Sequence, residues 1–100
     1  MTNMYPTTSA EKNVYLKYTA HITVATGRTS EALSLEGIDT ISDILSELDK
    51  KYPGFKELFM PTGGIFNSKT GIHVKRVGKP TLPISDEKQE IEDGDTLLFW

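Results

Sequence analysis

A chain of 100 residues has room for one small domain with a single hydrophobic core. Its 11 Lys and Arg against 14 Asp and Glu give a formal charge of −3, and 37% of its residues are hydrophobic, a balance typical of a folded domain rather than a disordered chain. The absence of cysteine excludes disulfides, thiolate metal sites and a cysteine nucleophile. We see no apolar run of the roughly 18 residues that a membrane span needs and no secretory signal, so we expect a cytoplasmic protein.

The N-terminal third predicts a flexible arm followed by a strand pair. Residues 1–13 are polar, and we expect them to form a flexible N-terminal arm, which leaves one domain over residues 14–100. Residues 14–24 alternate between apolar and polar side chains, a period of two that predicts one long strand with a buried face. A second alternating run, residues 31–36, follows a short loop that contains Gly27, so the two runs predict a β-hairpin.

An amphipathic helix follows the strand pair. Its apolar residues recur at helical spacing on one face: Ile41, Ile44, Leu45, Leu48 and Tyr52. Thr40 is suited to cap the start of this helix, and Asp43, three residues later, completes a capping box. Pro53 and Gly54 end the helix, and residues 55–61 predict one further short helical turn.

The C-terminal third predicts further strands separated by turns. Residues 65–66 and 72–77 flank a stretch of turn-forming residues and predict a second hairpin. One glycine and two prolines in residues 78–83 exclude a long strand there and leave room for one short edge strand. The turn sequence Asp93-Gly94-Asp95 precedes a final apolar strand, residues 96–100.

This order of elements predicts an α+β fold, a mixed sheet of four to five strands with one main helix packed across it. The first and last strands are the most hydrophobic, so we expect them side by side at the centre of the sheet. A hairpin, a helical crossover and a return strand can place the last strand parallel to the first. That architecture is the β-grasp, or ubiquitin-like, roll.

Negative charge is concentrated near the C-terminus. Residues 85–95 contain six acidic side chains and one lysine. This stretch is interpreted either as a solvated loop or as a landing surface for a basic partner. Its acidity opposes phosphate binding, so we expect no nucleic-acid partner.

Signatures of catalysis and of metal binding are missing from the sequence. There is no Gly-x-Ser-x-Gly elbow and no phosphate-binding glycine loop followed by lysine. The two histidines, His21 and His73, lack the further ligands that a metal site requires. We therefore expect neither an enzyme nor a bound metal or cofactor.

Three segments together resemble the small sulfur-carrier proteins of the ubiquitin-like type. They are residues 14–24, the helix start at residues 40–45, and Asp93-Gly94-Asp95 followed by Leu97-Leu98-Phe99. The family includes the small subunit of molybdopterin synthase, the thiamine sulfur carrier and the ubiquitin-related modifier. The resemblance implies that a C-terminal carboxylate is adenylated and then thiocarboxylated. It also implies two partners, an adenylating (E1-like) enzyme and a synthase or acceptor protein, and sulfur transfer in cofactor biosynthesis or tRNA thiolation.

The sequence departs from this family at the tail, where the family ends in Gly-Gly and this sequence stops at Trp100. Two glycines let the backbone thread the narrow channel of an adenylating enzyme, and a terminal tryptophan does not. Two hypotheses follow. Either the chain is a carrier whose tail lies beyond Trp100, or it is a tail-less β-grasp interaction module or accessory subunit without carrier chemistry.

The final strand also suggests a partner-binding surface. If Leu97 and Phe99 face the helix, then Leu98 and Trp100 point outward and form an apolar patch for a protein partner. Lys75 and Arg76 are candidates for its charged rim, although ordinary strand surface explains both as well. The predicted partner-binding residues are therefore Leu98, Trp100, Lys75 and Arg76.

Overall fold

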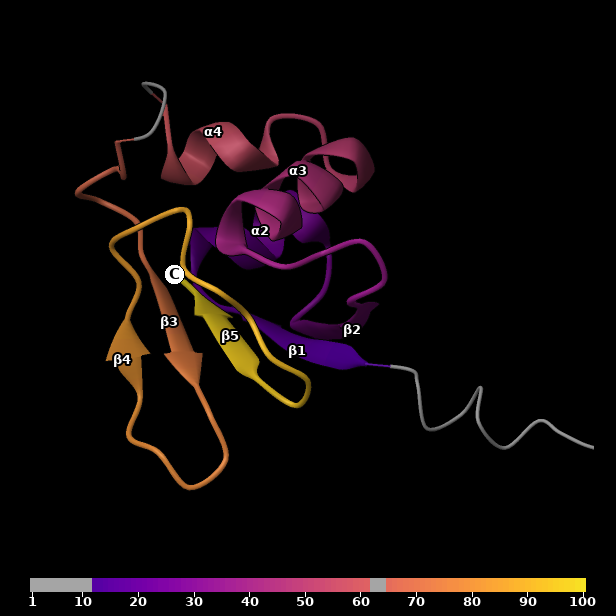
Figure 1. The fold of residues 1–100 in the computed structure, drawn as a ribbon. Helices are drawn as coiled ribbons and strands as arrows, with labels where there is room; N and C mark the ends of the chain where they lie inside the picture. Colours follow the sequence, from indigo (N-terminus) through magenta and orange to yellow (C-terminus); the bar gives the residue numbers. More distant parts are fainter. Residues whose placement is uncertain (1–11, 62–64) are drawn as a thin grey trace, which may run out of the picture.

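The fold is a five-stranded mixed sheet with helices packed on one of its faces (Figure 1). The computed structural model describes residues 12–61 and 65–100, so residues 1–11 of the predicted arm lie outside the described residues. The elements are β1 (Asn13–Tyr18), α2 (His21–Thr26), β2 (Ser30–Ser34), α3 (Ile41–Lys51), α4 (Phe55–Phe59), β3 (Ile72–Lys75), β4 (Leu82–Pro83) and β5 (Thr96–Phe99). Their order across the sheet is β2-β1-β5-β3-β4.

The first and last strands lie side by side at the centre of the sheet. β1 and β5 run parallel, and the other neighbouring strands pair antiparallel. This arrangement confirms the predicted α+β fold of the β-grasp type, including the parallel central pair. The short edge strand predicted within residues 78–83 is also present, as β4.

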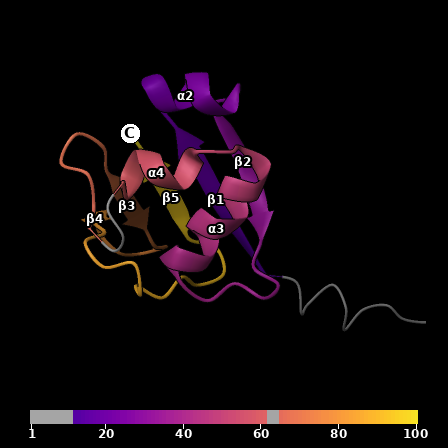
Figure 2. The ribbon, with the colours of Figure 1, turned by 90° about the horizontal axis from the view of Figure 1, so that it is seen from above.

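The core lies between the sheet and the helices α3 and α4 (Figure 2). Every second residue of the central strands is buried: Val14, Leu16, Tyr18, Ile72, Val74, Leu97 and Phe99. From α3 the predicted apolar stripe meets them with Ile41, Ile44, Leu45 and Leu48, all buried. The Phe99 ring centroid lies 5.5 Å from that of Phe55 and 5.4 Å from that of Phe59. The short helix α4 therefore closes the core directly over the last strand.

The acidic segment that precedes β5 is tied to the start of α3. The carbonyl oxygen of Gln89 accepts a hydrogen bond from Ile41 N at 3.0 Å, and that of Glu87 accepts one from Ser42 N at 2.8 Å. These bonds satisfy N–H groups that the first turn of a helix leaves without partners. Thr40 and Asp43 form the predicted capping box beside them. The bonds are made by backbone carbonyls, so the segment supports the start of α3 through its main chain.

The prediction of one long strand over residues 14–24 is wrong after Tyr18. Ala20 has φ 53° and ψ −135°, and Ile22 N donates to Thr19 O at 3.0 Å. These values are those of the first central residue of a type II′ turn, which reverses the chain. The short helix α2 follows and buries Ile22 and Thr26, while Val24 is 85% exposed. The alternating pattern of residues 21–24 thus belongs to a helix, and the antiparallel β1–β2 pair is joined through it.

The hairpin predicted between residues 65–66 and 72–77 is also wrong. β3 pairs with β4 on one side and with β5 on the other. The preceding segment is tied to the end of α4, because Asn67 N donates to Phe59 O at 2.7 Å and Thr70 Oγ1 donates to Leu58 O at 2.8 Å. These bonds supply the last carbonyls of the helix with donors, so the segment caps α4 instead of forming a strand.

None of the helices in residues 12–61 and 65–100 combines the length and the apolar character required to cross a membrane.

Replacement of Ala20 by glycine should stabilise the protein. A positive φ crowds the Cβ of alanine, and glycine relieves that strain at a smaller cost in unfolded-state entropy, so we expect a gain of about 0.5–1 kcal/mol in the free energy of unfolding. Ala25→Gly is the matched control within α2 and should cost about 0.5–1 kcal/mol, because glycine weakens a helix. Urea denaturation measures both changes. Destabilisation by Ala20→Gly would contradict the turn assigned to Thr19 and Ala20.

Candidate functional site

The face of the sheet opposite α3 and α4 carries the predicted partner-binding residues of the last strand. The register places these side chains on its outward positions: Asn13, Tyr15, Lys17, Ser30, Ala32, Ser34, His73, Lys75, Pro83, Thr96 and Leu98. We call this surface, together with Trp100, the outer face. Among these outward strand positions there is no carboxylate, and Tyr15 and Trp100 are 51% and 43% exposed. The outer face is thus partly apolar and bears cationic but no anionic side chains.

Trp100 extends β5 by one residue and lies against β3. Its backbone N donates to Gly71 O at 3.0 Å, and Gly71 N donates to Trp100 O at 2.8 Å. The indole Nε1 donates to Nδ1 of His73 at 2.8 Å. A Cβ placed on Gly71 would lie 2.2 Å from an indole carbon. The indole is therefore folded back over the bare backbone of Gly71 and held by His73.

Leu98 and Lys75 lie on the outer face beside this indole. In the register, Leu98 is opposite His73 of β3 on one side and Lys17 of β1 on the other. Lys75 is opposite Thr96 and is exposed, and its Nζ donates to the carbonyl of Lys79. The structure thus brings Leu98, Trp100 and Lys75 together on one surface.

Arg76 does not share this surface, because its guanidinium is engaged by the turn that precedes β5. Its Nε lies 3.2 Å from each carboxylate oxygen of Asp95, whose side chain is 1% exposed. Arg76 Nη2 donates to Glu90 O at 2.8 Å, and Glu92 N donates to Asp95 at 2.9 Å. A buried carboxylate is costly without a partner, so Arg76 has a structural role, and 30% of its side chain stays exposed.

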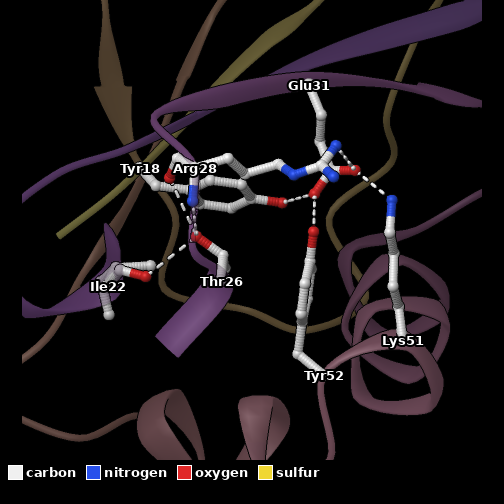
Figure 3. A network of polar contacts seen from close by, with 7 residues as sticks. All are labelled: Tyr18, Ile22, Thr26, Arg28, Glu31, Lys51 and Tyr52. Carbon is white, nitrogen blue, oxygen red and sulfur yellow. Dashed lines mark hydrogen bonds and ion pairs between the residues drawn. The ribbon is translucent and has the colours of Figure 1, made fainter. Parts of the chain in front are cut away.

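A second polar cluster, centred on Glu31, lies on the helix side of the sheet (Figure 3). The Glu31 carboxylate accepts hydrogen bonds from the hydroxyls of Tyr18 at 2.6 Å and Tyr52 at 2.7 Å. Lys51 Nζ pairs with the same carboxylate, and Arg28 Nη1 lies 3.5 Å from it. Because the Glu31 side chain is only 6% exposed, these four partners take the place of water. The cluster joins β1, β2 and the end of α3.

The connection that carries Arg28 is itself fixed by a hydroxyl. Thr26 Oγ1 lies 3.1 Å from Ile22 O and 2.9 Å from Arg28 O (Figure 3). These contacts close the C-terminal end of α2 onto the loop that leads to β2. The turn at Ala20 lies at the start of the connection between β1 and β2, and the Glu31 cluster lies at its end.

The contacts within the cluster lower the pKa of the carboxylate and raise the pKa values of its tyrosine and lysine partners. Burial alone would raise the pKa of Glu31, but the hydrogen bonds from Lys51, Tyr18 and Tyr52 outweigh it and hold that pKa below its ordinary value of 4.5. Burial, together with the bond to Glu31, raises the pKa of Tyr18 and that of Tyr52. The hydrogen bond to Glu31 raises the pKa of Lys51. At neutral pH the carboxylate is therefore charged, and both hydroxyls are donors.

The sequence pattern missed two parts of this arrangement. Leu33 and Leu35 share one face of the alternating run over residues 31–36, and Glu31 falls on the same face by alternation, which is a signal that could have found its cluster. The contact of Trp100 with Gly71 and His73 has no such signal, because it depends on which strands are neighbours. In the described residues no group of three or more His, Asp or Glu side chains is placed to hold a metal ion, and His21 is exposed on α2.

No protein-family model and no curated protein matches the chain. Solved structures do match it. The HVO 2177 protein of Haloferax volcanii has a TM-score of 0.67 at 16% identity, with 89% of this chain and 81% of that chain covered. Small archaeal modifier protein 1 (SAMP1) of Methanosarcina acetivorans has a TM-score of 0.63 at 21% identity, with 89% and 91% covered. A putative molybdopterin converting factor, subunit 1, of Pyrococcus furiosus has a TM-score of 0.64 at 21% identity, with 88% and 94% covered.

The chain shares its β-grasp fold with these solved structures. The resemblance drawn from the sequence is therefore confirmed at the level of the fold, since two of the matching structures are a small modifier protein and a molybdopterin converting factor subunit. The pairs are 16–21% identical, and a fold by itself does not establish an activity.

Substitution of Glu31 by glutamine should destabilise the protein in a pH-dependent way. The loss of charged hydrogen bonds should cost about 2 kcal/mol near neutral pH. Because the folded-state pKa of Glu31 lies below 4.5, the stabilisation by its carboxylate is complete above that value and disappears as the pH falls through the lowered pKa. Glutamine does not titrate, so the difference between the two proteins should shrink in that range.

Urea denaturation of both proteins at a series of pH values measures this effect. Glu47→Gln is the matched control, because Glu47 forms an exposed pair with Lys50 and its loss should cost less than about 0.5 kcal/mol. A stability difference for Glu31→Gln that stays constant down to pH 3 would show that the carboxylate is not responsible.

Proposed function

We propose that this chain is a ubiquitin-like sulfur carrier of the cytoplasm that is not itself an enzyme. The carboxylate at its native C-terminus is adenylated and thiocarboxylated, and it then donates sulfur in cofactor biosynthesis or in tRNA thiolation. Its partners are an adenylating (E1-like) enzyme and a synthase or acceptor protein, with no nucleic-acid or membrane partner. The observation that carries the proposal is the central position of β5, which leads the chain to Trp100 on the outer face.

The end of β5 supports this function because it is a fixed point. Phe99 is fully buried, and its carbonyl oxygen accepts hydrogen bonds from Thr19 N at 3.0 Å and Thr19 Oγ1 at 3.1 Å. A carrier must present a carboxylate to an enzyme's active site while its folded body stays outside. A rigid anchor at Phe99 sets the direction in which the chain leaves the domain, and the neighbouring outer face offers the surface for docking.

The docking surface in this proposal consists of Leu98, Trp100 and Lys75, and the exposed part of Arg76 is a secondary contact outside it. Tryptophan and partly exposed leucine provide apolar contact area, and tryptophan is enriched among residues that dominate binding energy. Lys75 adds a charge that speeds the approach of an acidic partner. Arg76 contributes less, because Asp95 and Glu90 already engage its guanidinium.

One observation favours the alternative of a tail-less interaction module or accessory subunit. Trp100 is hydrogen-bonded to Gly71 in both directions, so its backbone belongs to the sheet rather than to a free tail. Such a module uses the same docking surface and needs no carboxylate chemistry.

The test is adenylation of the protein with its native C-terminus by the adenylating enzyme of the source organism. In this step a carboxylate oxygen bonds to the α-phosphorus of ATP and pyrophosphate leaves, after which a sulfur donor displaces AMP. We expect an acyl-adenylate in the mass spectrum that requires both ATP and the enzyme. Leu98→Asp should slow its formation about tenfold or more, whereas Glu57→Gln on α4 should not.

Absence of the adduct from the folded native protein would rule out the carrier and leave the interaction module.

A further inference from the structure

The Trp100 side chain is held in place by contacts with two neighbouring residues, Gly71 and His73. We infer that Gly71 and His73 are positioning residues that hold the Trp100 indole flat on the outer face, as the anchor of a docking surface for a protein partner with an acidic contact surface. The inference rests on the proposed function for the identity of that partner, the adenylating enzyme. Beyond that function, it identifies the residues that hold Trp100 in place and the charge of the surface that the partner presents.

Gly71 is required by the indole rather than by the backbone. Five other glycines of the described chain have positive φ values, and Gly71 is not among them. A side chain at position 71 is excluded for a different reason, since its Cβ would lie 2.2 Å from one indole carbon and 2.4 Å from another. A Cβ at this position would therefore displace the indole from the Gly71 backbone. Gly71 has no side chain, so its backbone forms a flat contact surface on which the Trp100 indole lies. We call this surface the seat.

His73 fixes the direction of the indole on this seat. The Nε1–Nδ1 distance is 2.8 Å, the two ring planes are inclined by 26°, and the ring centroids are 5.8 Å apart. An indole N–H lies in the plane of its ring, so these values place the rings edge to edge with a hydrogen bond between them. Trp100 thus keeps one orientation and still leaves 43% of its surface exposed.

A side chain that is already fixed loses little conformational entropy when a partner binds. The indole covers Gly71 on the face of the sheet opposite α3 and α4. An exposed tryptophan held in one orientation is the arrangement expected of a prepared contact residue.

The charges around Trp100 indicate the chemistry of the partner. The formal charge of the chain is −3, yet Lys17 and Lys75 are the charged residues among the outward strand positions. Of the acidic side chains before β5, Glu92 and Asp95 pair with Arg76, and Asp93 accepts a hydrogen bond from Asn13 N at 2.8 Å, at the start of β1. Because the outer face is cationic on an acidic protein, a partner with carboxylates around an apolar contact is the complementary one.

The seat can be tested first without any partner. The chain contains one tryptophan, so its indole N–H gives one NMR signal. His73→Phe keeps a ring but removes the acceptor, and we expect the signal to shift and its exchange with water to rise several-fold. His73→Asn retains an acceptor near the position of Nδ1 and should restore the wild-type behaviour. His21→Phe on α2 is the matched control and should leave the signal unchanged.

The docking role is tested by the affinity for the adenylating enzyme. We expect Trp100→Ala to weaken binding at least tenfold, and His73→Phe and Gly71→Ala to weaken it several-fold, with His73→Asn close to wild type. The double variant Lys17→Glu/Lys75→Glu should slow association about tenfold at low salt and less at high salt. Lys50→Glu, at an exposed position on α3, is the control for charge reversal. Thermal melting of each variant verifies that it is folded.

The outcomes separate this inference from the proposed function. Wild-type affinity in folded His73→Phe and Gly71→Ala, or association unaffected by the charge reversals, would overturn the inference while adenylation still supported the carrier. Binding that depends on these residues without any acyl-adenylate would support the inference and overturn the carrier function. Failure of the wild-type protein to bind the enzyme would overturn both.

Discussion

The structure depends on the parallel pairing of β1 with β5 at the centre of the sheet. This contact joins residues 15–18 to residues 96–99, so the two ends of the domain must meet before the sheet is complete. β2 is added on the side of β1, and β3 and β4 are added on the side of β5. The helices α3 and α4 cover the pair. Loop closure between distant segments costs entropy. Burial of the core side chains along this pair offsets that cost, and among them are Tyr18 and Phe99, whose ring centroids are 5.6 Å apart.

The same pairing explains why the end of β5 is both a fixed point of the fold and the place of the proposed function. Phe99 is buried beneath α4, and the backbone of Trp100 is hydrogen-bonded to that of Gly71. The acidic segment before β5 binds the start of α3, and Arg76 holds the last turn through Asp95. Glu92 and Asp95 are thus paired with Arg76, and the charged residues among the outward strand positions are Lys17 and Lys75.

The sequence was sufficient where the information is local. Thr40 and Asp43 lie three residues apart and carry the capping box in themselves, and the apolar stripe of α3 and the strand after Asp95 are equally local. The sequence was insufficient where the structure depends on a turn or on which strands are neighbours in the sheet. Ala20 occupies a conformation that glycine favours, so nothing in its identity indicates a break, and the pattern of residues 14–24 continued through it. The seat of Trp100 depends on the pairing of β3 with β5, which the predicted hairpin had assigned elsewhere.

Amide hydrogen exchange in β5 tests the central claim most directly. If β5 is the shared central strand, the hydrogen-bonded amides of Leu97, Leu98 and Phe99 exchange only through global unfolding and rank among the slowest in the protein. Their opening free energies then equal the free energy of unfolding measured with urea. Fast exchange of these three amides, at the rate of an exposed terminus, would contradict the account, because the last strand would then not hold the two halves of the sheet together.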